Sequence, residues 1–312
     1  MRISIEEYNN IVGQLYIENT ELFLLSPTLC RCEGQTFNYE RYSNEKKNYN
    51  NYIFFLVKFL FKVIRDILFS LFSANGKLSS NDNSIFVFSF FDMRSIDGSF
   101  IREEYFRRIL DNNDDVVCFY KLSTPGFFFR GKKYLDLISN KNKKFACYAE
   151  YSFISIVMIL KALMLSLLHY FKFNKYKKLK SHKTKLENFI LKSHNREIFD
   201  GTIYQGYLQK LLYEKLFSSK PRLILSVWEN QPWHRILESV KKNITPNTLS
   251  KGFQHTGFSK KLLQHYPSKY EKNLLTYPDI VLCNGDINKN ELIKNSNISS
   301  NIISASALRQ DN

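Results

Sequence analysis

The sequence predicts an α/β fold with an open, doubly wound and mostly parallel sheet. Short runs rich in β-branched and aromatic residues recur along the chain, for example at residues 85–90 and 223–227. From residue 203 to residue 308 such runs alternate with helix-like segments through short connections, as parallel sheets require. A chain of 312 residues with 44% hydrophobic residues can bury a large core, which excludes a disordered protein.

The first expected element is an amphipathic helix over residues 52–72. Its charged residues Lys58, Lys62 and Arg65 follow the spacing i, i+4, i+7, which places them in one stripe of a helix. Two interpretations remain open: a surface helix packed on the core, or an interfacial helix that lies on anionic lipid.

The α/β part begins with a buried strand over residues 85–90. A polar loop from Asp92 to Gly98 follows, and then an amphipathic helix is expected over residues 99–110. The next two apolar runs, residues 115–121 and 143–150, predict a second and a third strand.

Residues 152–171 are almost entirely apolar, and a basic tract at residues 172–185 follows them directly. Twenty residues are enough to span a bilayer, but Lys161 stands near the middle of the run. Three interpretations stay open: a buried or partly buried helix, a helix docked in the plane of a membrane, and a membrane span. The basic tract suits anionic headgroups and equally suits a solvated loop.

The second half of the chain supplies the remaining strands and helices in regular alternation. Helices are expected at 203–217, 232–242 and 287–295, and strands at 221–228, 249–255, 278–285 and 301–308. Short connections between such elements favour right-handed crossovers and a Rossmann-like sheet. The expected organisation is a helical or irregular prelude over residues 1–83 and a Rossmann-like domain over residues 84–310, with the run at 152–171 as a helical insertion.

Net charge and cysteine usage limit the partners and the compartment. The formal net charge of +16 favours an anionic partner, such as a phospholipid surface or a nucleotide ligand. Outside residues 172–185 the basic residues are dispersed, and no nucleic-acid-binding motif is present, so no nucleic acid is expected. The five cysteines are odd in number and lie mostly in apolar runs, and the first 19 residues are too polar for a signal peptide. These features predict a cytoplasmic protein.

Polar side chains follow five of the expected strands at the point where each strand ends. Ligands of open parallel sheets bind beyond the carboxyl ends of the strands, so we expect these side chains to share one site. They are Asp92, Arg94 and Asp97; Glu229, Asn230 and Gln231; Gln254 and His255; Asn284 and Gly285; and Arg309.

Each of the three principal candidates also has a structural interpretation. Asp97 precedes Gly98 and could cap a helix. Glu229 precedes a helix that starts near Pro232, where a carboxylate suits the helix dipole. His255 could be a hydrogen-bonded turn residue. The two tryptophans of the chain, Trp228 and Trp233, are expected to pack the junction that holds Glu229.

The motifs that are missing argue against several enzyme classes. The chain has no phosphate-binding Gly-x-x-x-x-Gly-Lys loop, no Gly-x-Gly-x-x-Gly after a strand, no cysteine–histidine cluster and no Gly-x-Ser-x-Gly elbow. NTPase, dehydrogenase, zinc and hydrolase chemistries are therefore disfavoured. A carboxylate that accepts a proton from a sugar hydroxyl, beside groups that orient the sugar, is the minimum set for inverting glycosyl transfer.

Five short segments in the right order resemble a known family. They are FSFFD with DGSF and a later Tyr (88–105), WENQPWHRIL (228–237), GFQHTGFS (252–259), PDIVLCNGD (278–286) and ISASALRQ (303–310). Together they resemble bacterial O-antigen and capsule glycosyltransferases of the GT-B type, related to the Kdo and sialic-acid transferases. Two departures are Trp228, where the family tends to have Tyr, and His234, where it tends to have Glu.

The resemblance implies a function and a set of roles. It implies the acceptor-type N-terminal domain of an enzyme that transfers a sugar from a nucleotide-sugar, with a CMP-linked donor among the options, to a lipid-linked or glycan acceptor. The matched region ends where a linker to the donor domain would begin, so a separate donor-domain chain is an expected partner. Asp97 would act as the base, and Glu229 and His255 would line the pocket. No Asp-x-Asp occurs, so no metal is expected.

The combined expectation is a peripheral protein at the inner face of the bacterial cytoplasmic membrane. The alternative is a non-catalytic glycan-binding or scaffold module of a polysaccharide assembly complex, in which the same pocket binds without turnover.

Overall fold

The structure is a computed structural model of the chain. It describes residues 4–31, 52–72, 84–91, 96–97, 100–101, 105–106, 115–122, 135–138, 146–180, 184–254, 263–274 and 276–305.

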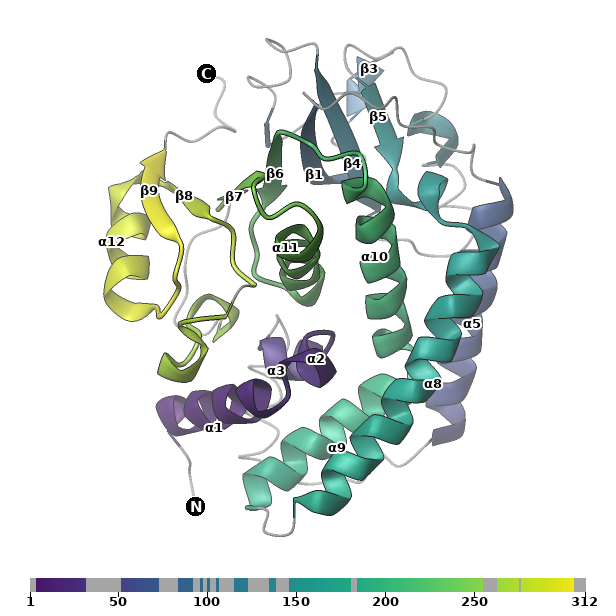
Figure 1. The fold of residues 1–312 in the computed structure, drawn as a ribbon, viewed down its shortest axis with the longest axis vertical. Helices are drawn as coiled ribbons and strands as arrows, with labels where there is room; N and C mark the ends of the chain where they lie inside the picture. Colours follow the sequence, from purple (N-terminus) through teal and green to yellow (C-terminus); the bar gives the residue numbers. More distant parts are fainter. Residues whose placement is uncertain are drawn as a thin grey trace.

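Seven strands of the described chain form one parallel sheet, which confirms the Rossmann-like α/β fold (Figure 1). The strand order is β5-β4-β1-β6-β7-β8-β9, so the chain starts in the middle, builds outward through β4 and β5, and then returns to the other side of β1. The strands are β1 (Ile85–Phe91), β4 (Val116–Leu122), β5 (Ala146–Ala149), β6 (Leu223–Val227), β7 (Leu249–Phe253), β8 (Ile280–Asn284) and β9 (Asn301–Ala305).

Both faces of the central strand are buried, which explains its continuous apolar sequence. Phe88 packs on one face against Tyr213 and Phe217 of helix α10, with ring centroids 5.5 and 6.0 Å away. Val87 points to the other face and belongs to a second core cluster, which includes residues from 135–138. Crossovers therefore cover both faces, as a doubly wound sheet requires.

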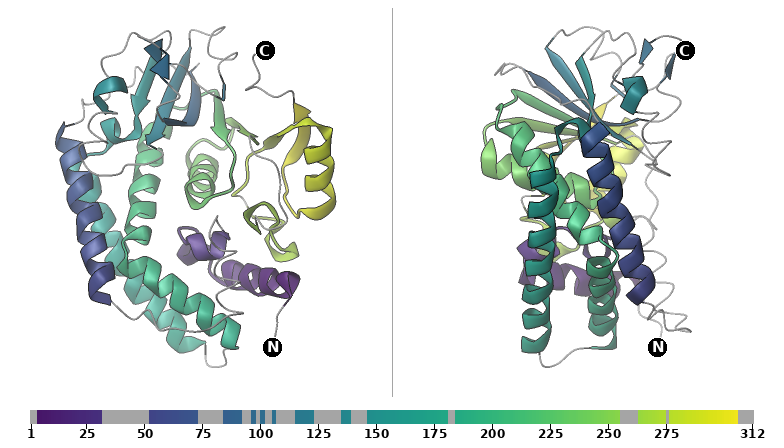
Figure 2. Two further views of the ribbon diagram at one scale, coloured as in Figure 1. Left: turned by 180° about the vertical axis from the view of Figure 1, so that it is seen from behind. Right: turned by 90° about the vertical axis from the view of Figure 1, so that its right-hand side faces the viewer.

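The helices fall into a group of long helices and a group of short ones. Figure 2 shows α5, α8 and α9 extending away from the sheet. The bounds are α1 (Ile5–Glu18), α2 (Thr20–Phe23), α3 (Pro27–Cys30), α5 (Tyr52–Phe72), α8 (Ile156–Leu179), α9 (Lys185–Phe199), α10 (Thr202–Phe217), α11 (Pro232–Ile244) and α12 (Gly285–Asn295), with the 3-10 helices η2 (Glu150–Phe153), η3 (Leu263–His265) and η4 (Lys269–Glu271).

The helix expected over residues 99–110 is wrong at its start. Residues Ile96–Asp97 (β2) and Phe100–Ile101 (β3) pair as an antiparallel hairpin, with Asp97 opposite Phe100. Asp97 thus lies in a strand and does not stand directly before a helix. Residues 102–104 and 107–110 lie outside the described residues.

The apolar run and the basic tract after it belong largely to one helix. Helix α8 begins at Ile156, after the 3-10 helix η2, and continues through the lysines to Leu179. Because residues 172–179 are helical, their interpretation as a solvated loop is wrong. Lys177 and Lys178 lie in the last turn, where positive charges interact favourably with the helix dipole. Helix α9, which the sequence pattern did not reveal, starts with a capping box formed by Thr184 and Glu187.

The N-terminal helices pack against segments that are far away in sequence. Asn9 of α1 donates a hydrogen bond to the Tyr266 carbonyl oxygen (2.7 Å). The backbone N–H of Thr28 in α3 donates to Glu197 Oε1 of α9 (2.7 Å). The described part of the N-terminal region thus closes over α9 and the region around η4 (Figure 1).

Candidate functional site

A cavity of about 370 Å³ lies beyond the carboxyl ends of β4, β5 and β6. The strand order reverses between β1 and β6, and open α/β sheets bind their ligands beside such a switch point. Helices α3, α5, α10 and α11 close the cavity on its other sides. Its lining consists of Leu25, Pro27, Arg65, Asp66, Lys121, Glu150, Tyr151, Ile154, Thr202, Gln205, Gly206, Leu208, Gln209, Leu212, Gln231, Pro232, Trp233 and Ile236.

The outer strands β4 and β5 each deliver one ionisable side chain to this cavity. Lys121 is the penultimate residue of β4, and Glu150 directly follows β5. The Lys121 ammonium lies 5.3 Å from the centre of the Trp233 ring, within the range of a cation–π interaction. The Tyr213 hydroxyl donates to Glu150 Oε1 over 3.3 Å, which orients the carboxyl group.

The two ionisable groups influence each other's protonation. Burial lowers the pKa of Lys121, and the negative charges of Glu150 and Glu229 partly oppose this. Burial raises the pKa of Glu150 above its usual value, and Lys121 and the Tyr213 hydrogen bond partly oppose this. Burial thus favours the uncharged form of each group, and their mutual attraction favours the charged forms.

Helix α5 contributes a second charged pair. The guanidinium Nη2 of Arg65 lies 2.8 Å from Asp66 Oδ1, and the Tyr151 hydroxyl donates to the same oxygen over 3.2 Å. Asp66 is completely buried, and burial raises its pKa although Arg65 opposes the shift. The Tyr151–Asp66 hydrogen bond links η2 to α5 at the wall of the cavity.

Amides and an indole supply the uncharged polar part of the lining. Gln205 and Gln209 come from successive turns of α10, and Gln231 precedes α11. The Gln231 amide donates to Glu229 Oε2 over 2.8 Å. Trp233 Nε1 has no hydrogen-bond acceptor within the described part of the chain. Such a mixture of amides and an aromatic ring suits a polyhydroxyl ligand more than a purely ionic one.

Of the residues predicted from the sequence, Gln231 lines this cavity and Glu229 lies close to it. The charge of Glu229 is close enough to Lys121 to raise its pKa. Asn230, between them, faces the interior and has a left-handed backbone conformation with φ of 49°. Its side chain donates to the Gln264 carbonyl oxygen and accepts from Arg235 Nε over 3.3 Å.

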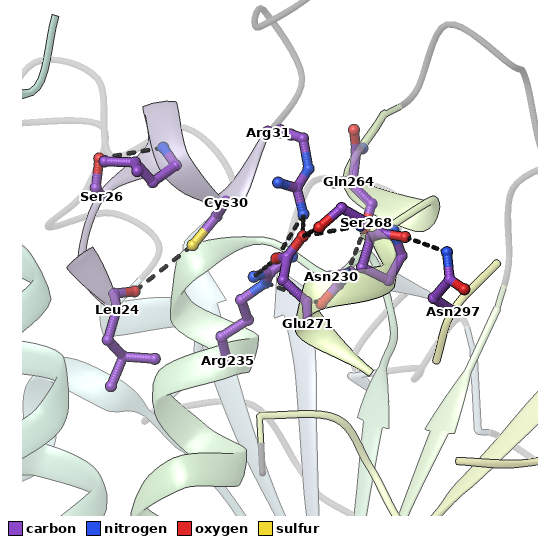
Figure 3. A network of polar contacts seen from close by, with 12 residues as sticks. Leu24, Ser26, Cys30, Arg31, Asn230, Arg235, Gln264, Ser268, Glu271 and Asn297 are labelled. Atoms are coloured by element: carbon purple, nitrogen blue, oxygen red, sulfur yellow. Dashed lines mark hydrogen bonds and ion pairs between the residues drawn. The ribbon is translucent and has the colours of Figure 1, made fainter. Parts of the chain in front are cut away.

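The neighbours of Asn230 form a buried ionic network, drawn in Figure 3. Arg31 Nη2 donates to Glu271 Oε1 over 2.6 Å, and Arg235 Nη1 lies 3.3 Å from the same oxygen. Burial would raise the pKa of Glu271, but the two arginines outweigh it and lower that pKa. This network fixes the turn between β6 and α11 and thereby positions Glu229 and Gln231.

Gln254, Asn284 and Gly285 lie at the ends of the next two strands. Gln254 is buried, and its Oε1 accepts a hydrogen bond from the Asn284 N–H over 3.0 Å. Gly285 opens α12 with φ of 82°, a conformation that favours glycine. These residues tie β7 to β8 and do not line the cavity.

The remaining predicted residues cannot be placed as side chains. The side chain of Asp97 and all of Asp92, Arg94, His255 and Arg309 lie outside the described residues. For Asp97, the backbone position in β2 is the one structural fact that bears on it.

Sequence reasoning missed several side chains of the cavity. Lys121 and Glu150 stand at the ends of the second and third expected strands, so the strand-end rule identifies both once it is applied to every strand. Gln205, Gln209 and Asp66 come from helices, and no local motif marks them. Their positions depend on how α5 and α10 cross the edge of the sheet.

Within the described residues, no group of three or more His, Cys, Asp or Glu side chains is arranged to hold a metal ion. Comparisons with protein-family models, curated proteins and solved structures found no match. The functional argument therefore rests on the chain's own residues and on the motif resemblance.

Proposed function

We propose that this chain is a glycosyltransferase domain of cell-surface polysaccharide assembly, and that the cavity beside β4, β5 and β6 binds the sugar at which transfer occurs. The observation that carries the proposal is a buried carboxyl group, Glu150, beside Lys121 in a cavity lined by amides and Trp233. The motif resemblance supplies the reaction class: transfer from a nucleotide-sugar, with a CMP-linked donor among the options, to a lipid-linked or glycan acceptor.

In this proposal the cavity residues have distinct roles. Glu150, with its raised pKa, takes the proton of the attacking hydroxyl, and Lys121 stabilises the carboxylate before transfer. Gln205, Gln209 and Gln231 orient the sugar hydroxyls. Asp97, the base expected from the sequence, is the competing candidate for proton removal.

The test is turnover of radiolabelled nucleotide-sugars with a membrane fraction as the source of acceptor. Glu150→Gln keeps the shape of the side chain and removes its ability to accept the proton. Turnover should fall about 10² to 10⁴ fold, the usual contribution of a general base. The matched control is Glu6→Gln, since Glu6 is exposed on α1 and should leave turnover unchanged.

A second substitution separates the two candidate bases. If Glu150→Gln turns over normally while Asp97→Ala is inactive, Asp97 is the base and the role given to Glu150 is wrong. A pH–rate profile adds a further check, because removing the true base removes its ionisation from the profile of kcat/KM.

The second candidate function is a glycan-binding or scaffold module. The observation that favours it is the predominance of uncharged lining, with amides and an aromatic ring, which serves binding without any chemical step. Saturable binding of oligosaccharide without turnover of any nucleotide-sugar would select this function over the enzyme.

A further inference from the structure

Helices α5 and α8 run along the same side of the molecule, away from the sheet (Figures 1 and 2). Each packs one face on the protein and leaves the other exposed. On the inner face of α8, His169 accepts or donates a hydrogen bond with Tyr207 (3.1 Å), and Ala162 is fully buried. On the inner face of α5, Asp66 and Phe69 are buried.

The basic residues of α5 pair with carboxylates of the protein, although the Lys58 side chain is still 52% exposed. Lys58 and Lys62 lie 3.7 and 3.9 Å from the Asp200 carboxylate, and Arg65 pairs with Asp66. A helix that faced water would normally show the opposite arrangement, with charges outside and apolar residues inside.

The outward faces of both helices are apolar. Large hydrophobic side chains are exposed to water along the whole length of each helix. Examples that are more than half exposed are Ile53, Phe54 and Phe61 of α5, and Val157, Leu160 and Phe171 of α8. We call this surface the α5–α8 face.

The exposed charges that the two helices themselves carry have one sign. Helix α8 contains no acidic residue, and its exposed charged residues are Lys161, Lys172, Lys175 and Lys178. The single carboxylate of α5, Asp66, is buried and paired. Lysines beside an anionic lipid surface are attracted to its headgroups. The positive charge therefore favours an anionic lipid surface over a protein partner that has few acidic residues.

The contacts of α8 argue against a membrane span. Among the described helices, α8 is the one long and apolar enough to cross a bilayer. In its most apolar stretch of 18 residues, 28% are buried. However, its inner face carries the buried polar residues Ser166 and His169 and packs on α9 and α10. If α8 crossed the bilayer, α9 and α10 would have to enter the bilayer with it. Docking of α8 in the plane of the membrane surface requires only its outer face.

We propose that the α5–α8 face inserts shallowly into the surface of an anionic membrane and holds the protein there. Apolar side chains enter the boundary between headgroups and acyl chains, and the α8 lysines contact the headgroups. The proposal is independent of the proposed function, because membrane binding is measured without any sugar substrate.

The test is co-sedimentation of the full chain with vesicles of phosphatidylethanolamine and phosphatidylglycerol, compared with vesicles of phosphatidylcholine. The wild type should bind the anionic vesicles and bind the neutral ones more weakly. The double variant Phe61→Asp/Leu160→Asp should lower the partition coefficient about tenfold or more, because each substitution removes a large apolar group from the interface. Its thermal stability should match the wild type, since these side chains are 69% and 59% exposed.

The matched control is Ile287→Asp in α12. Ile287 is 86% exposed, and α12 lies on the side of the molecule opposite α5 and α8 (Figure 1), so vesicle binding should not change. The proposal is overturned if the wild type does not sediment with anionic vesicles, or if the folded double variant binds as the wild type does. A lipid-free dimer that the double variant dissociates would also overturn it and assign the face to a second copy of the chain.

Discussion

Glu238 of α11 is a buried carboxyl group that forms no ion pair within the described part of the chain. It is completely buried, and the Ser250 hydroxyl donates to its Oε2 over 2.8 Å. Burial raises the pKa of Glu238 from 4.5 to about 7, although the Ser250 hydrogen bond and Lys241 oppose the shift. The protein must therefore become less stable as this group ionises.

We expect Glu238→Gln to remove a pH-dependent part of the stability. Because the folded pKa lies above the unfolded one, the contribution of Glu238 is fully present below pH 4.5 and is lost as the pH rises through 7. The difference between the folded and unfolded pKa of Glu238 corresponds to roughly 3 kcal/mol of unfolding free energy. Denaturant unfolding of both proteins at several pH values measures it: the variant should gain stability relative to the wild type as the pH rises. A constant difference between the two proteins across this range would contradict the assignment.

At the residue scale, the sequence placed Glu229 and Gln231 just after the strand that became β6, because backbone topology alone determines where strands end. Gln231 lines the cavity, and the functional roles expected for both residues stay predictions. Asn230 lies in the same tripeptide but turns inward, since its φ of 49° rotates it toward Arg235. A local sequence does not reveal such a turn, because it depends on buried partners as distant as Arg31 and Glu271.

At the element scale, the ionic network joins α3, η4 and α11, so its loss should detach the N-terminal helices. Glu271→Gln leaves Arg31 and Arg235 buried without a counter-charge. The expected cost is about 3 to 5 kcal/mol of unfolding free energy, as for other buried pairs that lose one partner. Denaturant unfolding measures the loss, and limited proteolysis should show earlier cleavage in residues 1–31.

Glu18→Gln is the matched control for that substitution. Glu18 pairs with Lys180 at 2.9 Å, but its side chain is 44% exposed, so its removal should cost at most about 1 kcal/mol. Equal losses in the two variants would show that the buried network does not hold the N-terminal helices in place.

Helices and strands with a clear periodic pattern of apolar residues could be predicted from the sequence. Elements whose position depends on contacts distant in sequence could not. The helix at 52–72 and the strands at 85–90 and 221–228 follow from their apolar patterns. Which side of α5 faces inward did not follow, because Asp200, the partner of Lys58 and Lys62, is far away in sequence. Helix α9 was hidden because its N-terminus adjoins a lysine-rich tract that resembled a loop.

At the scale of the whole molecule, topology was the most predictable property. Alternating strands and helices with short connections leave few arrangements other than a doubly wound sheet. The cavity volume and the helices that enclose it were not predictable, since they depend on how α5, α10 and α11 cross the edge of the sheet. Helix α5 lines the cavity with Arg65 and Asp66 and carries the α5–α8 face on its other side. Membrane docking would thus hold the cavity about one helix diameter, roughly 10 Å, from the lipid.

The central claim is that the cavity beside β4, β5 and β6 is the ligand site, and Trp233 provides a direct measurement. Trp233 lines the cavity, whereas Trp228 is completely buried. Tryptophan fluorescence is titrated with CMP-, UDP- and GDP-linked sugars and with surface oligosaccharide, in the wild type and in Trp233→Phe. We predict a saturable change with at least one of these probes that disappears in Trp233→Phe and needs about tenfold more ligand in Gln209→Ala. Saturable binding that neither substitution alters, or no binding of any probe, would contradict the account.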